Sequence, residues 1–185
     1  IFKEAFAFSP TGAVCTMRTS NGVDMLFFYD ALYAIINKDY YPPNDRGIWS
    51  IGYFYFDDGL TRVRKKSGGA FTECLMTEKG RLVAIPTDFK LMSYSDSVIL
   101  LEKDGKFGYM SSKLEWITAP EYVSAMPFLE GLAIVGNANG KFGALDTNGE
   151  MAIPMIFDSI TNCSDGLVVA YERENGYFVF AKRAK

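Results

Sequence analysis

Four carboxylates stand at the same place in successive, similar segments of this sequence: Asp58, Asp96, Glu130 and Asp165. Paired carboxylates serve as acid, base and nucleophile in glycoside hydrolysis, a reaction that needs no histidine. Asp57, beside Asp58, completes the set of candidates. A carboxylate that recurs in every segment is, however, typical of a turn, where it accepts hydrogen bonds from backbone N–H groups. We therefore expect these side chains to be structural, and a carboxylate-dependent glycoside hydrolase is the less favoured alternative.

The remaining composition removes most other catalytic chemistry. The 185 residues contain no histidine, which excludes Ser-His-Asp and Cys-His mechanisms and the usual His-containing zinc sites. The three cysteines, Cys15, Cys74 and Cys163, lie far apart and form no CxxC pair, so thiolate metal binding has little support. The expectation is a protein with no catalytic residues, no metal site and no cofactor.

Charge and hydropathy narrow the choice of partners. The net charge is −3 and the sequence pI is about 5.1, whereas a nucleic-acid surface needs a positive field. No apolar run approaches the roughly 20 residues of a membrane-spanning helix. We expect neither nucleic-acid binding nor membrane insertion. The first residue is Ile1 rather than Met, so an earlier start of the natural precursor is expected, and a removed signal peptide and a trimmed chain explain this equally well. Extracytoplasmic and cytoplasmic locations both stay open.

The carboxylates belong to a repeated segment of the chain. FLEGLAIV at residues 128–135 returns as CSDGLVVA at residues 163–170, after 35 residues. Earlier copies are YSDSVILL at residues 94–101 and, more distantly, FDDGLTRV at residues 56–63. Four copies at a nearly constant spacing predict a repeat protein.

Each repeat has the pattern of three short strands. Residues 132–135 are wholly apolar, as in a strand with both faces covered. Asn139-Gly140 is typical of a type I′ hairpin turn. In the next strand, Phe142-Gly143 places a glycine beside an aromatic ring, which indicates close approach of another backbone or ring. A third strand at residues 151–153 is expected to stop at Pro154, which cannot donate to the ladder. One repeat is thus predicted to be an antiparallel three-stranded meander.

Glycines mark fixed places in these repeats. The last repeat has Phe178 where earlier repeats have glycine, and a terminal repeat is expected to be an atypical cap. Phe178 is therefore expected to cover the end of the stack. The structural repeat positions are Gly105, Gly108, Gly131, Gly140, Gly143, Gly166 and Gly176.

The ordered motifs F-x-E-G-L-A-x-V, N-G-K-F-G-A-L-D and G-E-M-A-I-P resemble the bacterial WG (KWG) repeat family. Phe-Gly stands here in place of the Trp-Gly pair that names the family. The resemblance implies a β-rich repeat scaffold that is commonly attached to other domains and has no generally assigned activity. It places repeats at residues 56–89, 94–122, 128–158 and 163–180, with residues 1–55 as a divergent first repeat, all within a single β-repeat domain of residues 1–185.

These patterns predict an all-β domain of about four to five antiparallel three-stranded meanders stacked in a curved, solenoid-like array. A small propeller-like closed ring is the alternative. Residues 25–36 are almost wholly apolar, and they predict either two buried strands or one buried helix, with the family resemblance favouring strands. Trp116 occupies an apolar place in a third strand, so we expect it in the core.

A loop rich in proline and aromatic residues is predicted at residues 37–49. Its rings, Tyr40, Tyr41 and Trp49, are the candidate binding residues, because aromatic rings offer wide apolar area for peptide or glycan contacts. The alternative is that they cap the N-terminal side of the stack.

The function that these observations favour is a non-catalytic binding or scaffold module that recognises a protein or glycan partner through loops between the repeats. A structural spacer for an attached domain is the alternative. The two differ in whether the surface carries an exposed patch whose mutation abolishes binding.

Overall fold

The protein consists of strands and turns over the whole part of the chain that the structure describes. This computed structural model describes residues 4–5, 14–20, 23–29, 35–41, 58–67 and 69–181, and these residues contain no helix. The prediction of an all-β protein is confirmed. The chain divides into two compact units, residues 1–86 and 87–185. The single continuous domain expected from the repeats stays a prediction.

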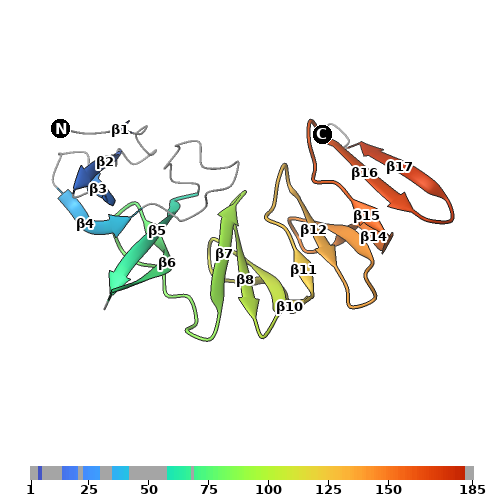
Figure 1. The fold of residues 1–185 in the computed structure, drawn as a ribbon, viewed down its shortest axis with the longest axis horizontal. Helices are drawn as coiled ribbons and strands as arrows, with labels where there is room; N and C mark the ends of the chain where they lie inside the picture. The colour runs from blue at the N-terminus through green and yellow to red at the C-terminus, as the bar shows by residue number, and fades with distance from the viewer. Residues whose placement is uncertain are drawn as a thin grey trace. The chain divides into compact units, whose positions relative to one another are not determined.

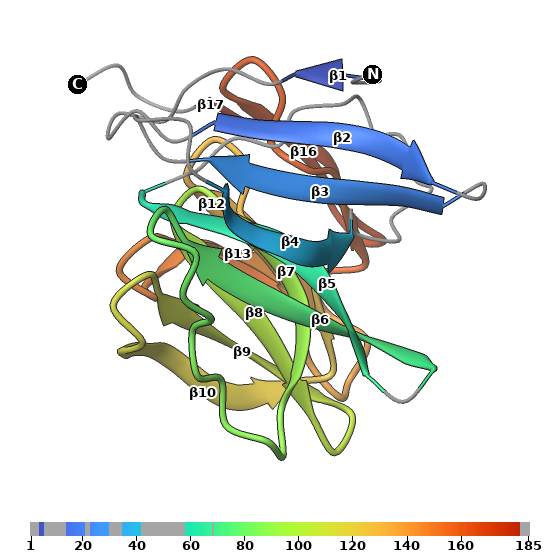
Figure 2. The same cartoon turned by 90° about the vertical axis from the view of Figure 1, so that its left-hand side faces the viewer.

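The first unit contains one six-stranded antiparallel sheet with its strands in chain order (Figure 2). Of the apolar stretch at residues 25–36, residues 25–29 lie in the third strand and residues 35–36 in the fourth, as the interpretation as strands predicts for them. The six strands are β1 (Glu4–Ala5), β2 (Val14–Ser20), β3 (Val23–Tyr29), β4 (Ile35–Tyr41), β5 (Leu60–Ser67) and β6 (Ala70–Thr77).

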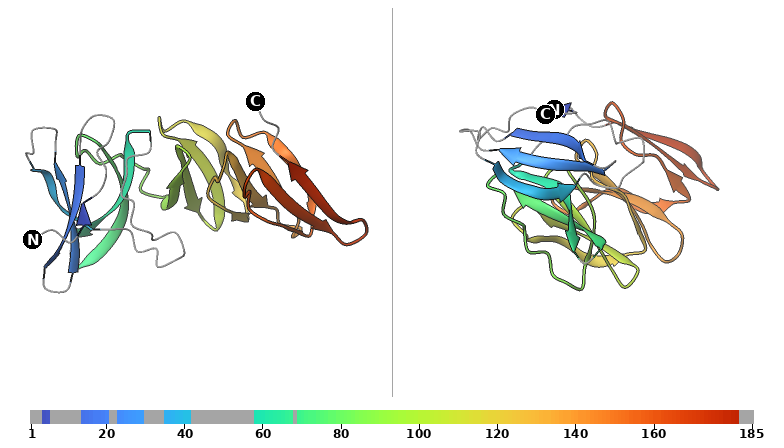
Figure 3. Two further views of the ribbon diagram at one scale, coloured as in Figure 1. Left: turned by 90° about the horizontal axis from the view of Figure 1, so that it is seen from above. Right: turned by 60° about the vertical axis from the view of Figure 1, so that its left-hand side comes forward.

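The second unit contains three antiparallel sheets, named here B, C and D (Figures 1 and 3). Sheet B consists of β7 (Lys90–Ser95), β8 (Val98–Lys103), β9 (Lys106–Ser111) and β10 (Trp116–Tyr122). Sheet C consists of β11 (Ser124–Ala125), β12 (Leu132–Gly136), β13 (Phe142–Asp146) and β14 (Met151–Phe157). Sheet D consists of β15 (Ser159–Ile160), β16 (Leu167–Glu172) and β17 (Gly176–Ala181).

The predicted meanders are present as β8–β9–β10 and β12–β13–β14, and each has one further strand before it. The additional strands, β7, β11 and β15, come from the segments that link the repeats. Sheet D has no third meander strand among the residues described. None of the described sheets closes into a barrel, and the choice between solenoid-like array and closed ring stays a prediction.

The third strand of each meander continues past its proline, so the predicted stop at this residue is wrong. Pro120 lies inside β10 and Pro154 inside β14. The register between β13 and β14 shifts between the pairs Phe142–Phe157 and Ala144–Ile153, and β10 shows the same kind of shift against β9. The proline therefore occupies a β-bulge on the outermost strand, where a missing N–H group is tolerated.

The bulge explains the glycine in the neighbouring strand. A Cβ atom on Gly143 would lie 2.6 Å from the carbonyl oxygen of Ile153 and 2.9 Å from Cα of Met155. A Cβ atom on Gly108 would lie 2.7 Å from the nitrogen of Pro120. The predicted close approach is thus confirmed, and its partner is the bulged backbone. The glycine of one strand and the proline of the next form a single structural unit.

The turns are confirmed at their predicted places, but Asn139-Gly140 and Asn175-Gly176 are not type I′ turns, since neither asparagine has positive φ. Asp104-Gly105 has two residues with positive φ, of 51° and 75°, as a type I′ turn requires. At Asn139-Gly140, only Gly140 has positive φ, and the Asn137 and Lys141 backbones close a longer loop. The type I′ prediction is therefore wrong there, because the loop has more than two residues. In such a loop, a type I turn is followed by a single left-handed residue, which here is Gly140.

Leu114 occupies a left-handed position that two related turns give to glycine. Its φ is 66°, close to the 72° of Gly80 and the 83° of Gly149. In all three turns, the N–H of this residue donates to the carbonyl that opens the turn. We expect Leu114→Gly to raise the free energy of unfolding by about 0.5–1 kcal/mol, because leucine is strained in this conformation by more than glycine costs in entropy. Urea titration measures the gain, and Leu114→Ala, which keeps the strain, should not show it.

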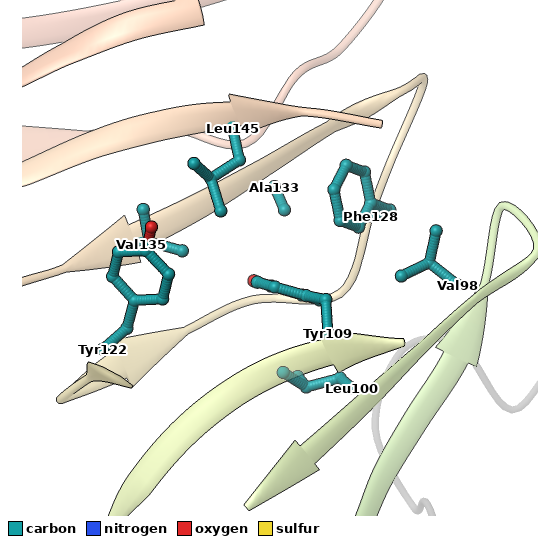
Figure 4. Close-up of a cluster of buried hydrophobic side chains, with 8 residues drawn as sticks. All are labelled: Val98, Leu100, Tyr109, Tyr122, Phe128, Ala133, Val135 and Leu145. Carbon is teal, nitrogen blue, oxygen red and sulfur yellow. The ribbon is translucent and has the colours of Figure 1, made fainter. Parts of the chain in front are cut away.

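In the second unit, the core lies between successive sheets. Figure 4 shows the cluster between sheets B and C. Tyr109 is fully buried, its ring meets Phe128 edge-on at 5.1 Å between centroids, and its hydroxyl donates to the carbonyl oxygen of Met126 at 2.7 Å. Burial raises the pKa of Tyr109 well above its usual value, and burial, with a contribution from Glu121, raises the pKa of Tyr122 to about 12. Both rings therefore pack as neutral groups.

A second cluster lies between sheets C and D and includes Ile134, Ala144, Phe157 and Val168. Alternate residues of β12 thus belong to different clusters, since Ala133 and Val135 face the first cluster. The apolar strand of the repeat has both faces covered, as its sequence predicts.

Candidate interaction surface

The recurring carboxylates lie in turns, as their repetition predicts. Asp58, Asp96, Glu130 and Asp165 all have positive φ, between 44° and 53°. The residue that follows each also has positive φ, so these are type I′ turns. Asp57 lies outside the described residues. This geometry uses the carboxylates to build hairpins and gives no support to a paired acid and base.

Two of these carboxylates also join one repeat to the next. The Asp96 carboxylate accepts the N–H of Gly131 at 2.9 Å. The Glu130 carboxylate accepts the N–H groups of Asp165 and Gly166 at 3.1 and 2.8 Å, and the thiol of the buried Cys163 lies 3.4 Å from it. Each turn therefore stabilises the turn of the following repeat, which the spacing of the motifs alone could not reveal.

Glu130→Gln is expected to lower the free energy of unfolding by about 1 kcal/mol, because hydrogen bonds to a charged acceptor are stronger than those to an amide. The matched control is Asp165→Asn. No hydrogen bond to the Asp165 carboxylate is found within the described ranges, and the change should fall within roughly 0.3 kcal/mol of zero. Equal losses in the two variants, measured by urea titration, would contradict the role of Glu130 as a link between repeats.

The outward side of sheet D carries a row of exposed apolar and aromatic side chains. The pairs Leu167–Ala181, Val169–Val179 and Tyr171–Tyr177 place six apolar or aromatic side chains on one face. Tyr177 is 77% exposed, Val179 66% and Leu167 47%. The Tyr171 and Tyr177 rings contact each other, with centroids 4.9 Å apart. A contiguous exposed face of this kind marks an interaction site more often than scattered apolar residues do.

The opposite face of sheet D packs onto sheet C. Val168 and Ala170 are buried there, and Phe180 packs against the same cluster. Phe178 contacts Phe157, with ring centroids 5.4 Å apart. Phe178 therefore points back into the stack, and its neighbours Tyr177 and Val179 point outward. The expectation that Phe178 covers the end of the stack is therefore wrong, and the described residues cover sheet D on one face only.

The outward face of sheet D corresponds to a face of sheet C that is covered. By the 35-residue spacing, Leu167 and Val169 correspond to Leu132 and Ile134, and Val179 corresponds to Ala144. Ile134 is 6% exposed and Ala144 is fully buried, because sheet D lies over them. Side chains that are in the core of one repeat are thus on the surface of the next.

A polar pocket lies on the surface of the second unit. It is lined by Lys141, Asp158, Glu172, Arg173 and Glu174. The Lys141 ammonium donates to the Asp158 carboxylate at 2.9 Å, and the Arg173 N–H donates to the other oxygen at 2.9 Å. These hydrogen bonds hold the pKa of Asp158 below its usual value. The Asp158 carboxylate in this pocket is thus held in its ionised form by two hydrogen bonds.

No cluster of three His, Cys, Asp or Glu side chains able to hold a metal ion occurs within the described residues. No helix in that part of the chain is long and apolar enough to cross a membrane.

The candidate binding rings of the N-terminal region do not form a loop together. Tyr40 and Tyr41 end strand β4 and pair with Lys65 and Arg64 of β5. The prediction of a loop is therefore wrong for residues 37–41, because strand pairing on both sides of β4 outweighs the local turn signals. Trp49 lies outside the described residues. A binding role for the three rings stays a prediction.

Trp116 lies at the surface of sheet B. Trp116 was expected in the core and is 43% exposed, with its ring beside that of Phe89 at 5.3 Å, so that expectation is wrong. The outward face of sheet D was not among the candidates. The alternation of Tyr177 and Val179 in the last repeat is a pattern that could have indicated this face. The corresponding residues of the repeat before it alternate in the same way, but they are covered. Among the predicted structural repeat positions, Gly105, Gly131, Gly140, Gly166 and Gly176 have positive φ.

Comparison with known proteins supports the repeat assignment. The family model described as "WG containing repeat" matches residues 107–142 and 142–177. A search of curated protein sequences found no match. Similar solved structures include the computationally designed Ika4 protein, with 14% identity over 69% of this chain and 88% of that chain, at a TM-score of 0.39.

Two further structures cover almost the whole chain. BamB from Moraxella catarrhalis is 13% identical over 96% of this chain and 58% of that chain, at a TM-score of 0.37. The WD40 β-propeller domain of Doa1 is 14% identical over 99% of this chain and 83% of that chain, at a TM-score of 0.29. At these scores, the fold assignment rests on the sheets themselves. Residues 107–177 thus match two consecutive WG repeats, the family that the sequence motifs resemble.

Proposed function

We propose that this chain is a non-catalytic repeat scaffold that binds a protein partner through the outward face of sheet D. The observation that carries the proposal is the exposure of Tyr177, Val179 and Leu167. Their counterparts in sheet C are the buried Ala144 and the partly buried Phe142 and Leu132, which sheet D covers. Covering such apolar area releases water and is the main favourable term in protein association.

A protein fits this face better than a glycan does. The six outward side chains of β16 and β17 carry no charge, and the tyrosine hydroxyls are their only polar groups. A sugar needs hydrogen-bond partners for its hydroxyls as well as a ring to stack on. An apolar protein surface needs none, and aromatic residues are enriched at the centre of protein interfaces.

The non-catalytic part of the proposal is supported by the use of the carboxylates. The Asp96 and Glu130 carboxylates accept hydrogen bonds from backbone N–H groups of the following turn. A carboxylate held in this way lacks a free geometry for proton transfer to a substrate.

A photo-crosslinking experiment tests the proposal. Benzoylphenylalanine replaces Tyr177 in one variant and, in the matched control, Met151, an apolar residue of sheet C that is 43% exposed. We expect illumination in cells of the source organism to yield a discrete protein adduct from position 177 and none from position 151. The absence of an adduct at position 177 would contradict the proposal and favour a spacer.

A further inference from the structure

We propose that the partner on the outward face of sheet D is the same face of a second copy of this chain, so that the protein forms a two-fold symmetric dimer. This inference rests on the proposed function and specifies its partner. Three observations support it. The equivalent face of sheet C is covered by another sheet, Phe178 blocks the bulged path of a third strand along β17, and the outward face of sheet D carries no charge.

The equivalent face of sheet C shows which kind of structure covers such a surface. Ile134 and Ala144 of sheet C are buried beneath Val168 and Ala170 of sheet D. The covering structure is therefore an antiparallel sheet laid face to face, with small and branched side chains between the two layers. Sheet D presents β-branched and aromatic side chains of the same kind on its outward side, at Val169, Val179 and Tyr177.

Phe178 makes a further repeat in line with the others an unfavourable occupant. In sheets B and C, Gly108 and Gly143 allow the bulged third strand to cross directly over the central strand, with backbone atoms 2.6–2.9 Å from the place of a Cβ atom. Phe178 fills that place in sheet D and contacts Phe157. A third strand therefore cannot take the same bulged path along β17.

The face is complementary to itself. A two-fold axis brings identical patches together, so each group must tolerate its own copy. Residues 167, 169, 171, 177, 179 and 181 are Leu, Val, Tyr, Tyr, Val and Ala. Two chains with a net charge of −3 each can meet here without placing like charges opposite each other, and the exposed apolar side chains of one copy supply the cover for those of the other.

Sedimentation velocity of the full purified chain tests the inference. We expect a single species whose sedimentation coefficient rises from that of a monomer to that of a dimer between roughly 1 µM and 200 µM, the range of a moderately stable interface. Val179→Asp should remain monomeric throughout, because it would bury two unpaired carboxylates at the contact. Position 179 is 66% exposed, so the variant should keep the circular dichroism spectrum and melting temperature of the wild type.

The matched control is Met151→Asp, which adds the same charge to an exposed apolar residue of sheet C. It should dimerise as the wild type does. A wild-type chain that stays monomeric over the whole range overturns the inference, as does dimerisation that survives Val179→Asp or is lost equally in Met151→Asp. If the purified chain is monomeric and position 177 still crosslinks to another protein, the second copy is the wrong partner while the proposed function stands.

Discussion

Gly143→Val is expected to lower the free energy of unfolding by about 3 kcal/mol, at the upper end of the range for overpacked cores. The reason is the bulge that passes over this residue. A Cβ atom would meet the carbonyl oxygen of Ile153 at 2.6 Å and the Met155 backbone at 2.9 and 3.0 Å. Because these are backbone atoms of a paired strand, they cannot move aside as the end of a flexible side chain could. Urea titration followed by circular dichroism measures the loss.

Gly140→Ala provides the contrast. Gly140 also belongs to the repeat motif, but a Cβ atom there has no neighbour within 4 Å and the only cost is a φ of 72°. We expect a loss of about 1 kcal/mol from the left-handed conformation alone. A loss below about 1 kcal/mol for Gly143→Val, or a loss no larger than that of Gly140→Ala, would contradict the close approach of the bulge.

Phe128→Ala is expected to cost about 4 kcal/mol, as truncation of a buried aromatic residue does. Phe128 is 2% exposed and belongs to the cluster between sheets B and C, where its ring contacts Tyr109 at 5.1 Å (Figure 4). The two sheets would be left with a cavity that rigid strands on both sides cannot close. The same titration measures this loss.

Trp116→Ala is the informative control for Phe128→Ala. Tryptophan is the larger residue, and its position in the sequence pattern favours the core. Its side chain is nevertheless 43% exposed and contacts Phe89 at the surface of sheet B. We expect a loss of about 1 kcal/mol. If Trp116→Ala cost as much as Phe128→Ala, the assignment of the core to the layer between the sheets would be contradicted.

The contact between repeats and the proposed contact between molecules have the same physical basis. Val168 and Ala170 of sheet D cover Ile134 and Ala144 of sheet C, while Leu167 and Val179 of sheet D remain exposed. A repeat unit that cannot cover both of its faces needs a neighbour on each side. Within the chain that neighbour is the next repeat, and at sheet D it is, in our proposal, a second molecule.

The repeat, the all-β class, the positions of most turns and the close packing at Gly143 were all predictable from the sequence. Each of them depends on local backbone geometry or on a motif repeated at a fixed spacing. Several features were decided only by the tertiary structure. The bulge that carries β14 past Pro154 depends on which strands lie side by side. The hydrogen bonds that Glu130 accepts from the next turn likewise depend on which turns are neighbours. Val179 and Ala144 occupy the same place in the repeat, yet one is exposed and the other is buried. Burial is set by what lies over a side chain, and no periodicity within one strand contains that information.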